Sequence, residues 1–230
     1  MGPKDIFWSN HYLRHSQRRQ EHLATLDLPL AGRAVLEVGA GIGDHTSFFL
    51  DRECSVIVAE AQEQNLTILR QRYPDLDVRR LDLNNPPLQP ISVDIVYCYG
   101  VLYHLERPGP AIAWMTDCAG SMLLLETCVA AGDNDDVYPF FETAEDPDNA
   151  VTGRGCRPTR SWVRRELAVG FPHVYLPLTQ PWHEEFPLDW SQPELAEKSL
   201  IRAVFIASDK PLDNRLFTEE IPVKQTRRAC

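Results

Sequence analysis

The stretch VLEVGAGIGDHT, residues 35–46, constrains the fold of this 230-residue chain more than any other segment. An apolar, β-branched run ends at Glu37, and glycines follow at the alternate positions Gly39, Gly41 and Gly43. Such a run predicts a buried strand, and glycine lets the next turn approach a ligand or another part of the backbone closely. We therefore expect the first strand of an α/β sheet here, with a binding turn at its carboxyl end.

Two common nucleotide-binding turns do not fit this spacing. A dinucleotide-binding turn has the form G-x-G-x-x-G, and counting from Gly39 places Asp44 where the third glycine belongs. A carboxylate there would also repel a pyrophosphate held at the start of the following helix. The Walker form does not occur, because no G-K-[S/T] follows the turn. A nicotinamide-dependent oxidoreductase is therefore disfavoured but stays open as an alternative.

Apolar runs and helical patterns alternate through the first half of the chain, which predicts a mostly parallel sheet with helices on both faces. The expected strands are residues 34–38, 55–60, 76–83, 93–99, 121–129, 172–178 and 200–208. The expected helices are residues 9–28, 44–52, 63–73, 109–119 and 159–170. The last two strands have no obvious long helix between them, so we expect an antiparallel pair at one edge of the sheet.

One domain is expected over residues 31–210, with an N-terminal helical extension over 1–30 and a C-terminal tail over 211–230. Inside the domain, residues 128–157 are acidic and rich in turn-forming residues, so we expect an insertion or a lid there. If this acidic segment lines a pocket, it favours a cationic or amine-bearing substrate. If it only solvates the surface, it says nothing about the substrate.

Composition narrows the partners and the setting. The formal net charge of −10 opposes long-range attraction of nucleic acid, which is therefore disfavoured as a partner. The six cysteines include no C-x-x-C pair, which favours a reduced, cytoplasmic location and gives no support to zinc. No apolar run approaches the roughly 18 residues of a membrane span, so we expect no membrane partner. The oligomeric state stays open.

Acidic residues also end the next two expected strands, Glu60 after SVIVA and Asp82 in RRLDLNN. Together with the E-x-G-x-G-x-G turn, they resemble the class I S-adenosylmethionine-dependent methyltransferase family over residues 30–130. The resemblance implies a Rossmann-like methyltransferase fold: a mostly parallel seven-stranded sheet with an antiparallel last strand and helices on both faces. It also implies S-adenosylmethionine as the cofactor, with Glu37 toward its ammonium group, Glu60 toward its ribose hydroxyls and Asp82 toward its adenine.

The fourth expected strand ends in YCYGVLYHLERP, residues 97–108. In the resembled family this end lies by the reacting centre, so Tyr103 and His104 would face the substrate. The GVLYH segment is similar to small-molecule methyltransferases and to some transfer-RNA wobble-uridine modifying enzymes. The full set of cofactor-binding residues implied by the resemblance is Glu37, Gly39, Ala40, Gly41, Gly43, Glu60, Ala61, Asp82, Leu83, Tyr99 and Gly100.

His104 is the catalytic candidate, because the unperturbed pKa of histidine suits a general base; a purely structural, turn-capping role stays open. Further substrate contacts are expected from Tyr12, Tyr103, Trp182 and His183, and from Arg14, which is also a candidate partner for the cofactor carboxylate. The loop around Trp182 and His183 interleaves aromatic and polar residues, which suits recognition or a hydrophobic plug. No ligand spacing around His183 supports a metal.

The sequence therefore predicts an S-adenosylmethionine-dependent methyltransferase that acts on a small-molecule acceptor by in-line displacement. The alternatives are a tRNA-modifying methyltransferase, a nicotinamide-dependent oxidoreductase, and a methyltransferase-like binding protein without activity. The acceptor atom stays open.

Overall fold

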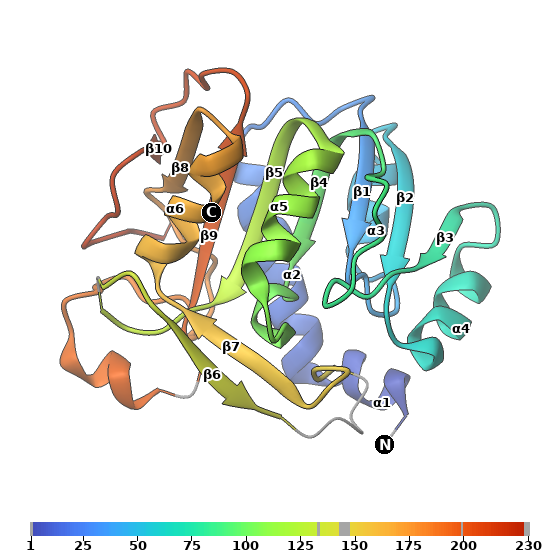
Figure 1. Cartoon of the computed structure of the whole chain (residues 1–230), viewed down its shortest axis with the longest axis horizontal. Helices are drawn as coiled ribbons and strands as arrows, with labels where there is room; N and C mark the ends of the chain where they lie inside the picture. Colours follow the sequence, from blue (N-terminus) through green and yellow to red (C-terminus); the bar gives the residue numbers. More distant parts are fainter. Residues whose placement is uncertain (1, 133, 143–147, 199, 228–230) are drawn as a thin grey trace.

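The computed structural model describes residues 2–132, 134–142, 148–198 and 200–227. Within these residues the chain forms one eight-stranded sheet, a separate two-stranded hairpin, and helices on both faces of the large sheet (Figure 1). The strands of the large sheet lie in the order β10-β8-β9-β5-β4-β1-β2-β3. Their bounds are β1 Ala34–Val38, β2 Ser55–Glu60, β3 Asp77–Arg80, β4 Val93–Tyr99, β5 Ala119–Cys128, β8 His173–Pro177, β9 Arg202–Ser208 and β10 Phe217–Thr218.

The expected Rossmann-like architecture is confirmed. Strands β3, β2, β1, β4 and β5 are parallel neighbours, and β9, the last long strand, runs antiparallel to β5 and β8. The expected antiparallel pairing of the last two long strands is confirmed as β8–β9. One detail differs from expectation: a short eighth strand, β10, pairs with β8 and takes the edge of the sheet. All seven residues of β9 are buried, as a strand flanked on both sides requires.

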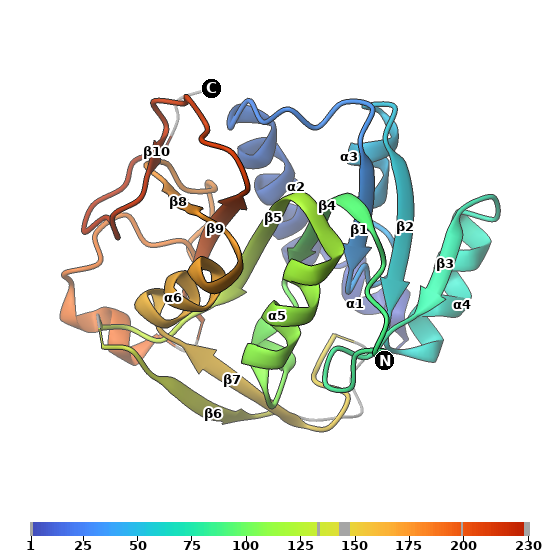
Figure 2. The same cartoon turned by 45° about the horizontal axis from the view of Figure 1, so that its top comes forward.

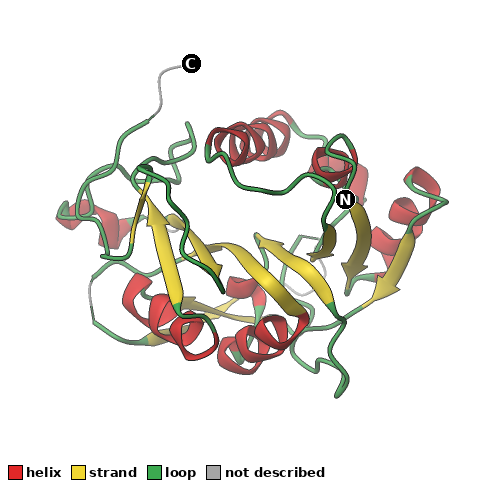
Figure 3. Cartoon of the chain, turned by 90° about the horizontal axis from the view of Figure 1, so that it is seen from above, coloured by secondary structure: helices red, strands yellow, loops and turns green. Residues whose placement is uncertain are grey.

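Two layers of helices cover the sheet, one on each face (Figures 2 and 3). Helices α5 and α6 pack over β4, β5, β8 and β9 on one face, and α2, α3 and α4 supply the core of the other. Helix α2 begins after Ser9, whose hydroxyl accepts the Tyr12 N–H at 3.3 Å. The helices are α1 Pro3–Phe7, α2 Asn10–Thr25, α3 Thr46–Leu50, α4 Glu63–Arg72, η1 Leu102–His104, α5 Pro108–Cys118, α6 Arg160–Gly170 and η2 Pro193–Glu197.

The segment expected to be an irregular insertion contains a hairpin. Strands β6 (Val137–Phe141) and β7 (Arg154–Pro158) pair antiparallel, and residues 133 and 143–147 of the segment lie outside the described residues. Strand β7 packs on η1, where a Cβ added to Gly155 would lie 2.3 Å from the carbonyl oxygen of Tyr103. The hairpin therefore rests directly on the end of β4. Its action as a lid, like the domain boundaries at 30 and 210, stays a prediction.

Among the described helices, none has the length and apolar character that a membrane span requires. The N-terminal segment is not a loose appendage. Leu23 and Leu26 of α2 and its following turn are fully buried in the same apolar cluster as Val35 of β1.

We expect Gly155→Ala to lower the melting temperature and to displace the hairpin from η1, because backbone atoms of Tyr103 and His104 occupy the space of the new Cβ. The cost should be about 1–3 kcal/mol, read from denaturant unfolding. The matched control is Gly109→Ala in α5, whose Cβ would meet its nearest neighbour at 3.4 Å. Equal stability of the two variants would contradict the close packing of β7 on η1.

Candidate functional site

Successive side chains of a strand point to opposite faces of the sheet. This alternation places several polar side chains on the face that α2 covers. Val35, Ile95 and Tyr97 belong to the apolar cluster on that face, whereas the intervening Leu36 and Val96 belong to the opposite one. The same alternation turns further polar residues toward α2 near the carboxyl ends of the parallel strands. They are Glu37 of β1, Tyr97 and Tyr99 of β4, Glu126 of β5 and Arg202 of β9.

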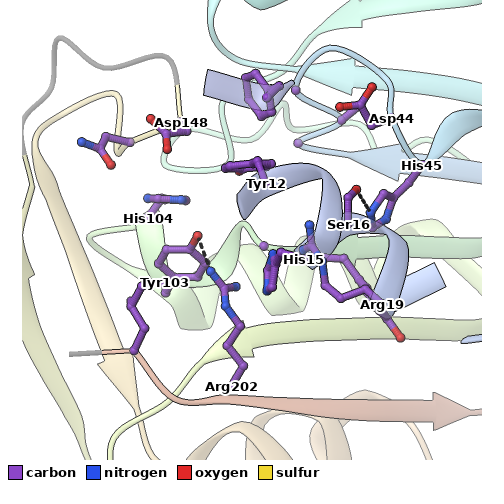
Figure 4. A pocket seen from close by; sticks show the side chains of 18 of the residues that line it. Tyr12, His15, Ser16, Arg19, Asp44, His45, Tyr103, His104, Asp148 and Arg202 are labelled. Atoms are coloured by element: carbon purple, nitrogen blue, oxygen red, sulfur yellow. Dashed lines mark hydrogen bonds between the residues drawn. The ribbon is translucent and has the colours of Figure 1, made fainter. Parts of the chain in front are cut away.

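Helix α2 faces these strands with a polar stripe of its own. Tyr12, His15, Ser16 and Arg19 follow helical spacing, so they share one face. Between this stripe and the strand ends lies a cavity of about 450 Å³, lined by all four residues and by the glycine turn (Figure 4). A second cavity of about 90 Å³ adjoins it and shares Tyr12 and the turn as its lining.

The glycine turn forms the boundary between the two cavities. Gly39 and Gly41 have φ angles of +67° and +57°, which glycine adopts without strain, and both line the two cavities. Ala40 lines the larger one. Gly43 lines neither: a Cβ there would lie 2.6 Å from the Tyr73 ring, so this glycine permits packing against the end of α4.

Glu37 is a buried carboxyl group at the base of the larger cavity. Its Oε2 accepts the Thr46 hydroxyl hydrogen bond at 2.6 Å. Burial raises its pKa to about 8, against the opposing effect of that hydrogen bond. Glu37 can therefore hold a proton near neutral pH, and in its ionised form it is an acceptor for a cationic group.

The other two strand-end acids lie on the smaller cavity. Glu60 is buried, and its carboxylate accepts backbone N–H groups of Gly41, Ala61 and Gln62, each at 2.8 Å. Asn65 forms a further side-chain hydrogen bond with the same carboxyl group, and Glu60 lines the smaller cavity. Asp82 lines this cavity together with Ala61 and Leu83. The smaller cavity thus brings together the acids predicted from successive strand ends.

A hydrogen-bonded chain connects α2 to the floor of the larger cavity. His45 contacts the Tyr97 hydroxyl through Nδ1 at 2.5 Å and the Ser16 hydroxyl through Nε2 at 2.6 Å. The adjacent Tyr99 hydroxyl is buried without a hydrogen-bond partner among the described residues. A buried hydroxyl of this kind is costly unless something else satisfies it, so Tyr99 marks a place for a polar ligand atom.

Two buried arginines share one buried carboxylate above this floor. Arg19 and Arg202 donate to Glu126 at 3.1 and 3.0 Å. Arg202 also donates to Glu185 at 2.6 Å and to the Tyr103 hydroxyl at 3.1 Å, so it orients that ring in the cavity (Figure 4). Arg19, Glu126, Glu185 and Arg202 were not among the site residues predicted from the sequence. The stripe spacing in α2 was the available signal for Arg19.

His104 lines both cavities and has a carboxylate partner from the hairpin. Its Nδ1 lies 2.6 Å from Oε2 of Glu142, which also accepts the Ala150 N–H at 2.8 Å. Burial alone would raise the pKa of Glu142, but the His104 hydrogen bond and the nearby Arg157 outweigh it and hold that pKa below its usual value. An ionised Glu142 accepts only, so His104 carries its proton on Nδ1 and presents Nε2 as an acceptor.

The predicted substrate residues divide into two groups. Tyr12 and Tyr103 line the larger cavity, and Tyr99 and Gly100 border it as expected for the cofactor set. Three others lie outside both cavities. Arg14 is on the solvent side of α2 and pairs with Glu184, Trp182 is 55% exposed, and His183 is buried beneath His15.

Comparison with known proteins finds methyltransferases. Residues 35–118 match a family described as "Methyltransferase domain". A tRNA U34 carboxymethyltransferase of Trichlorobacter lovleyi is 34% identical over 123 residues, 48% of this chain and 36% of that protein. A probable S-adenosylmethionine-dependent methyltransferase of Mycolicibacterium smegmatis is 39% identical over 75 residues, 33% of this chain and 29% of that protein. The matches thus span about a third of these relatives' length.

Solved structures share the fold. The N-terminal domain of EvdMO1, crystallised in the presence of SAH and D-fucose, superposes with a TM-score of 0.63 at 17% identity, over 88% of this chain and 85% of that one. An S-adenosylmethionine-dependent methyltransferase from Mesorhizobium loti gives a TM-score of 0.58 at 18% identity, over 83% and 97% of the two chains. At these identities the likeness shows the architecture.

The raised pKa of Glu37 predicts a pH dependence of stability. An unfolded glutamate titrates near pH 4.3, so between about pH 4.3 and 8 the native state holds a proton that the unfolded state has lost. Stability therefore falls as pH rises through this window. Glu37→Gln removes the titration, so the wild type should lose stability relative to this variant from about pH 5 to pH 8 in denaturant unfolding. The control is Glu194→Gln at an exposed site; a constant difference for Glu37→Gln would contradict the raised pKa.

Proposed function

We propose that this chain, which carries a domain of the class I S-adenosylmethionine-dependent methyltransferase family, transfers a methyl group from S-adenosylmethionine to a small-molecule acceptor. The observation that carries the proposal is the pair of adjoining cavities at the carboxyl edge of the sheet, with strand-end acids at one end and His104 lining both. The acids suit a cofactor, and the imidazole suits an acceptor that must lose a proton.

The residues present fit the cofactor. The smaller cavity offers Glu60 to ribose hydroxyls, and Asp82 with Leu83 to the adenine. The larger cavity offers Glu37 and the Tyr99 hydroxyl to the amino-acid end. The amino-acid end is a carboxylate as well as an ammonium, and it needs a cation.

Arg19 fits this role better than Arg14, the candidate partner predicted from the sequence, which pairs with Glu184 on the solvent side of α2. The Nη1 of Arg19 lies 3.0 Å from the position of a Cβ on Gly100, and its buried Nε has no hydrogen-bond partner among the described residues. Gly100 has a φ of +81° and ends β4 at the centre of the site. We assign the cofactor carboxylate to Arg19 on these contacts.

Bound S-adenosylmethionine supplies an electrophilic methyl group. The residues of this chain position the acceptor and manage its proton. The Glu142 carboxylate fixes the tautomer of His104, whose Nε2 takes the proton of the acceptor. The ring centroid of Tyr103, which Arg202 holds, lies 3.9 Å from that of His104. Tyr103 and Tyr12 line the cavity together with His104 and are the surfaces against which an acceptor packs (Figure 4).

The volume of the larger cavity, about 450 Å³, supports a small-molecule acceptor, because ligand pockets of this kind measure about 300–1,000 Å³. The lining of this cavity contains both acidic and basic side chains. It therefore gives less support to the cationic substrate that the acidic insertion suggested. Two described carboxylates of this acidic segment line the cavity: Glu142, which is paired with His104 and Arg157, and Asp148. We therefore propose an acceptor whose reacting atom carries a removable proton and leave the sign of its charge open.

A tRNA acceptor is the second candidate, favoured by the names of relatives such as the Trichlorobacter lovleyi protein. The net charge of −10 opposes it. A gel shift with tRNA across salt concentrations decides: binding that weakens steeply with salt would favour RNA. The nicotinamide and non-catalytic alternatives are tested by thermal shift with NAD and by calorimetry with S-adenosylhomocysteine.

We expect Arg19→Met to weaken S-adenosylhomocysteine binding by about 10- to 100-fold in calorimetry, the value of a hydrogen bond to a charged group. Arg14→Met, on the opposite side of the same helix, should leave the affinity unchanged, and Arg19→Lys should restore part of it. Melting temperatures confirm folding of each variant. Equal affinities of the Arg19 and Arg14 variants would overturn the assignment of Arg19.

Turnover should depend on His104. A screen with labelled S-adenosylmethionine identifies an acceptor, and His104→Ala should then lower kcat by about 10²- to 10⁴-fold, the usual contribution of a general base. S-adenosylhomocysteine affinity should not change, since His104 acts on the acceptor. Glu142→Gln should also lower kcat and alter the pH profile, whereas His173→Ala, on β8, should do neither. An unchanged rate in His104→Ala would remove the histidine from the mechanism.

A further inference from the structure

A cluster of imidazoles and carboxylates lies beside the larger cavity and has no part in the proposed reaction. His11 and His15 are one helical turn apart on α2 and face His183, Glu184 and Glu185 of the loop between β8 and β9. Ligand atoms of His15, His183 and Glu185 lie within 4.8 Å of one another, as do those of His11, His183 and Glu184. Both triads share His183.

The spacing of the rings matches joint coordination of one ion. A nitrogen–zinc bond of about 2.1 Å puts a ring centroid about 3 Å from the metal, so two tetrahedral imidazole ligands have centroids about 5 Å apart. The centroids of His15 and His183 are 4.7 Å apart, and those of His11 and His183 are 5.6 Å apart. His11 and His15, at 6.4 Å with parallel rings, fit one ion less well.

The buried histidines are unsatisfied as they stand. His15 and His183 are 5% and 1% exposed, and the Nε2 of each is buried without a hydrogen-bond partner among the described residues. Imidazole nitrogens are common metal ligands, so the two unpartnered Nε2 atoms are the candidate ligand atoms.

Glu185 is oriented for the same role. Its Oε2 accepts the Arg202 N–H at 2.6 Å and lies 3.5 Å from Nε2 of His15, and its Oε1 lies 3.6 Å from Nε2 of His11. A hydrogen bond to one oxygen of a ligating carboxylate is a common means of fixing its position. In this structure the Glu185 N–H donates to Nδ1 of His183 at 3.4 Å. When Nε2 of His183 binds a metal, the ring proton has to lie on Nδ1, so the Glu185 N–H has to turn away.

The charge balance selects the kind of ion. Three carboxylates, of Glu126, Glu184 and Glu185, face three guanidinium groups, of Arg14, Arg19 and Arg202. Without surplus negative charge, affinity has to come from imidazole–metal bonds. This favours zinc or another borderline transition metal over Mg²⁺ and Ca²⁺, which prefer oxygen ligands.

We propose that His15, His183 and Glu185 bind a divalent transition metal of the zinc class at the edge of the acceptor cavity. His15, Glu185 and His11 line that cavity. Three protein ligands leave one position of a tetrahedral ion open, and here that position faces the cavity, where an oxygen or nitrogen of the acceptor can take it. The site stands on its own ligand geometry and does not depend on methyl transfer.

The test is metal binding by the full chain. We expect calorimetric titration and metal analysis after desalting to give one Zn²⁺ per chain, with no binding of Mg²⁺, and Co²⁺ to give the visible absorption of a tetrahedral centre. His15→Gln, His183→Gln and Glu185→Gln should each weaken Zn²⁺ binding by at least about 100-fold, since loss of a mere orienting partner already costs 10- to 100-fold. Zn²⁺ should also raise the melting temperature of the wild type.

His173→Gln is the matched control, because this histidine lies on β8 and pairs with Glu219, away from the cluster. It should keep wild-type affinity for Zn²⁺. A wild type that retains no Zn²⁺, or cluster variants that bind it as tightly as the control, would overturn the site, and this readout holds even if one variant fails to fold. Calorimetry with S-adenosylhomocysteine in the presence of a chelator is separate, so failure there would bear on the methyltransferase proposal alone.

Discussion

The Glu126 carboxylate, buried to 0% exposure and shared by Arg19 and Arg202, is the interaction on which the site depends. It ties α2 to β5 and β9, and through Arg202 it reaches Glu185 in the loop between β8 and β9 and Tyr103 after β4. A buried carboxylate cannot lose its partners without a large desolvation cost. One ion network therefore sets the positions of five separate chain segments around a single cavity.

This network explains why an N-terminal helix becomes a wall of the site. Burial of Leu23 and Leu26 attaches one end of α2 to the core, but apolar contact alone leaves the rotation of a helix loosely defined. The Arg19–Glu126 pair and the Ser16–His45–Tyr97 chain set that rotation. Tyr12 and His15 therefore point toward the strand ends. There Tyr12 lines both cavities together with the glycine turn, and His15 belongs to the proposed metal site.

Most of the sheet could be predicted from the sequence, because buried strands read as apolar runs. The expected bounds of β1, β2 and β4 agree with the structure. The hairpin β6–β7 could not be predicted. Strand β6 is largely exposed and contains Pro139, so its pattern carries no alternation, and it is held by pairing and by the packing of β7 on η1. Its contribution to the site, Glu142 opposite His104, followed from that tertiary packing.

The errors on α2 have a different physical cause. The sequence shows which residues share a helical face, but not which face turns inward when both carry apolar and polar side chains. Leu13 of α2 is apolar but 44% exposed, and the inward face is the one with His15, Ser16 and Arg19. The same ambiguity hid the histidine cluster. His15 lies about 170 residues before its proposed partners His183 and Glu185, and the rotation imposed by Glu126 brings the two segments together. The polar residues that determine which face of a helix points inward are therefore hard to identify from the local sequence. Their partner is a buried charge far away in the chain.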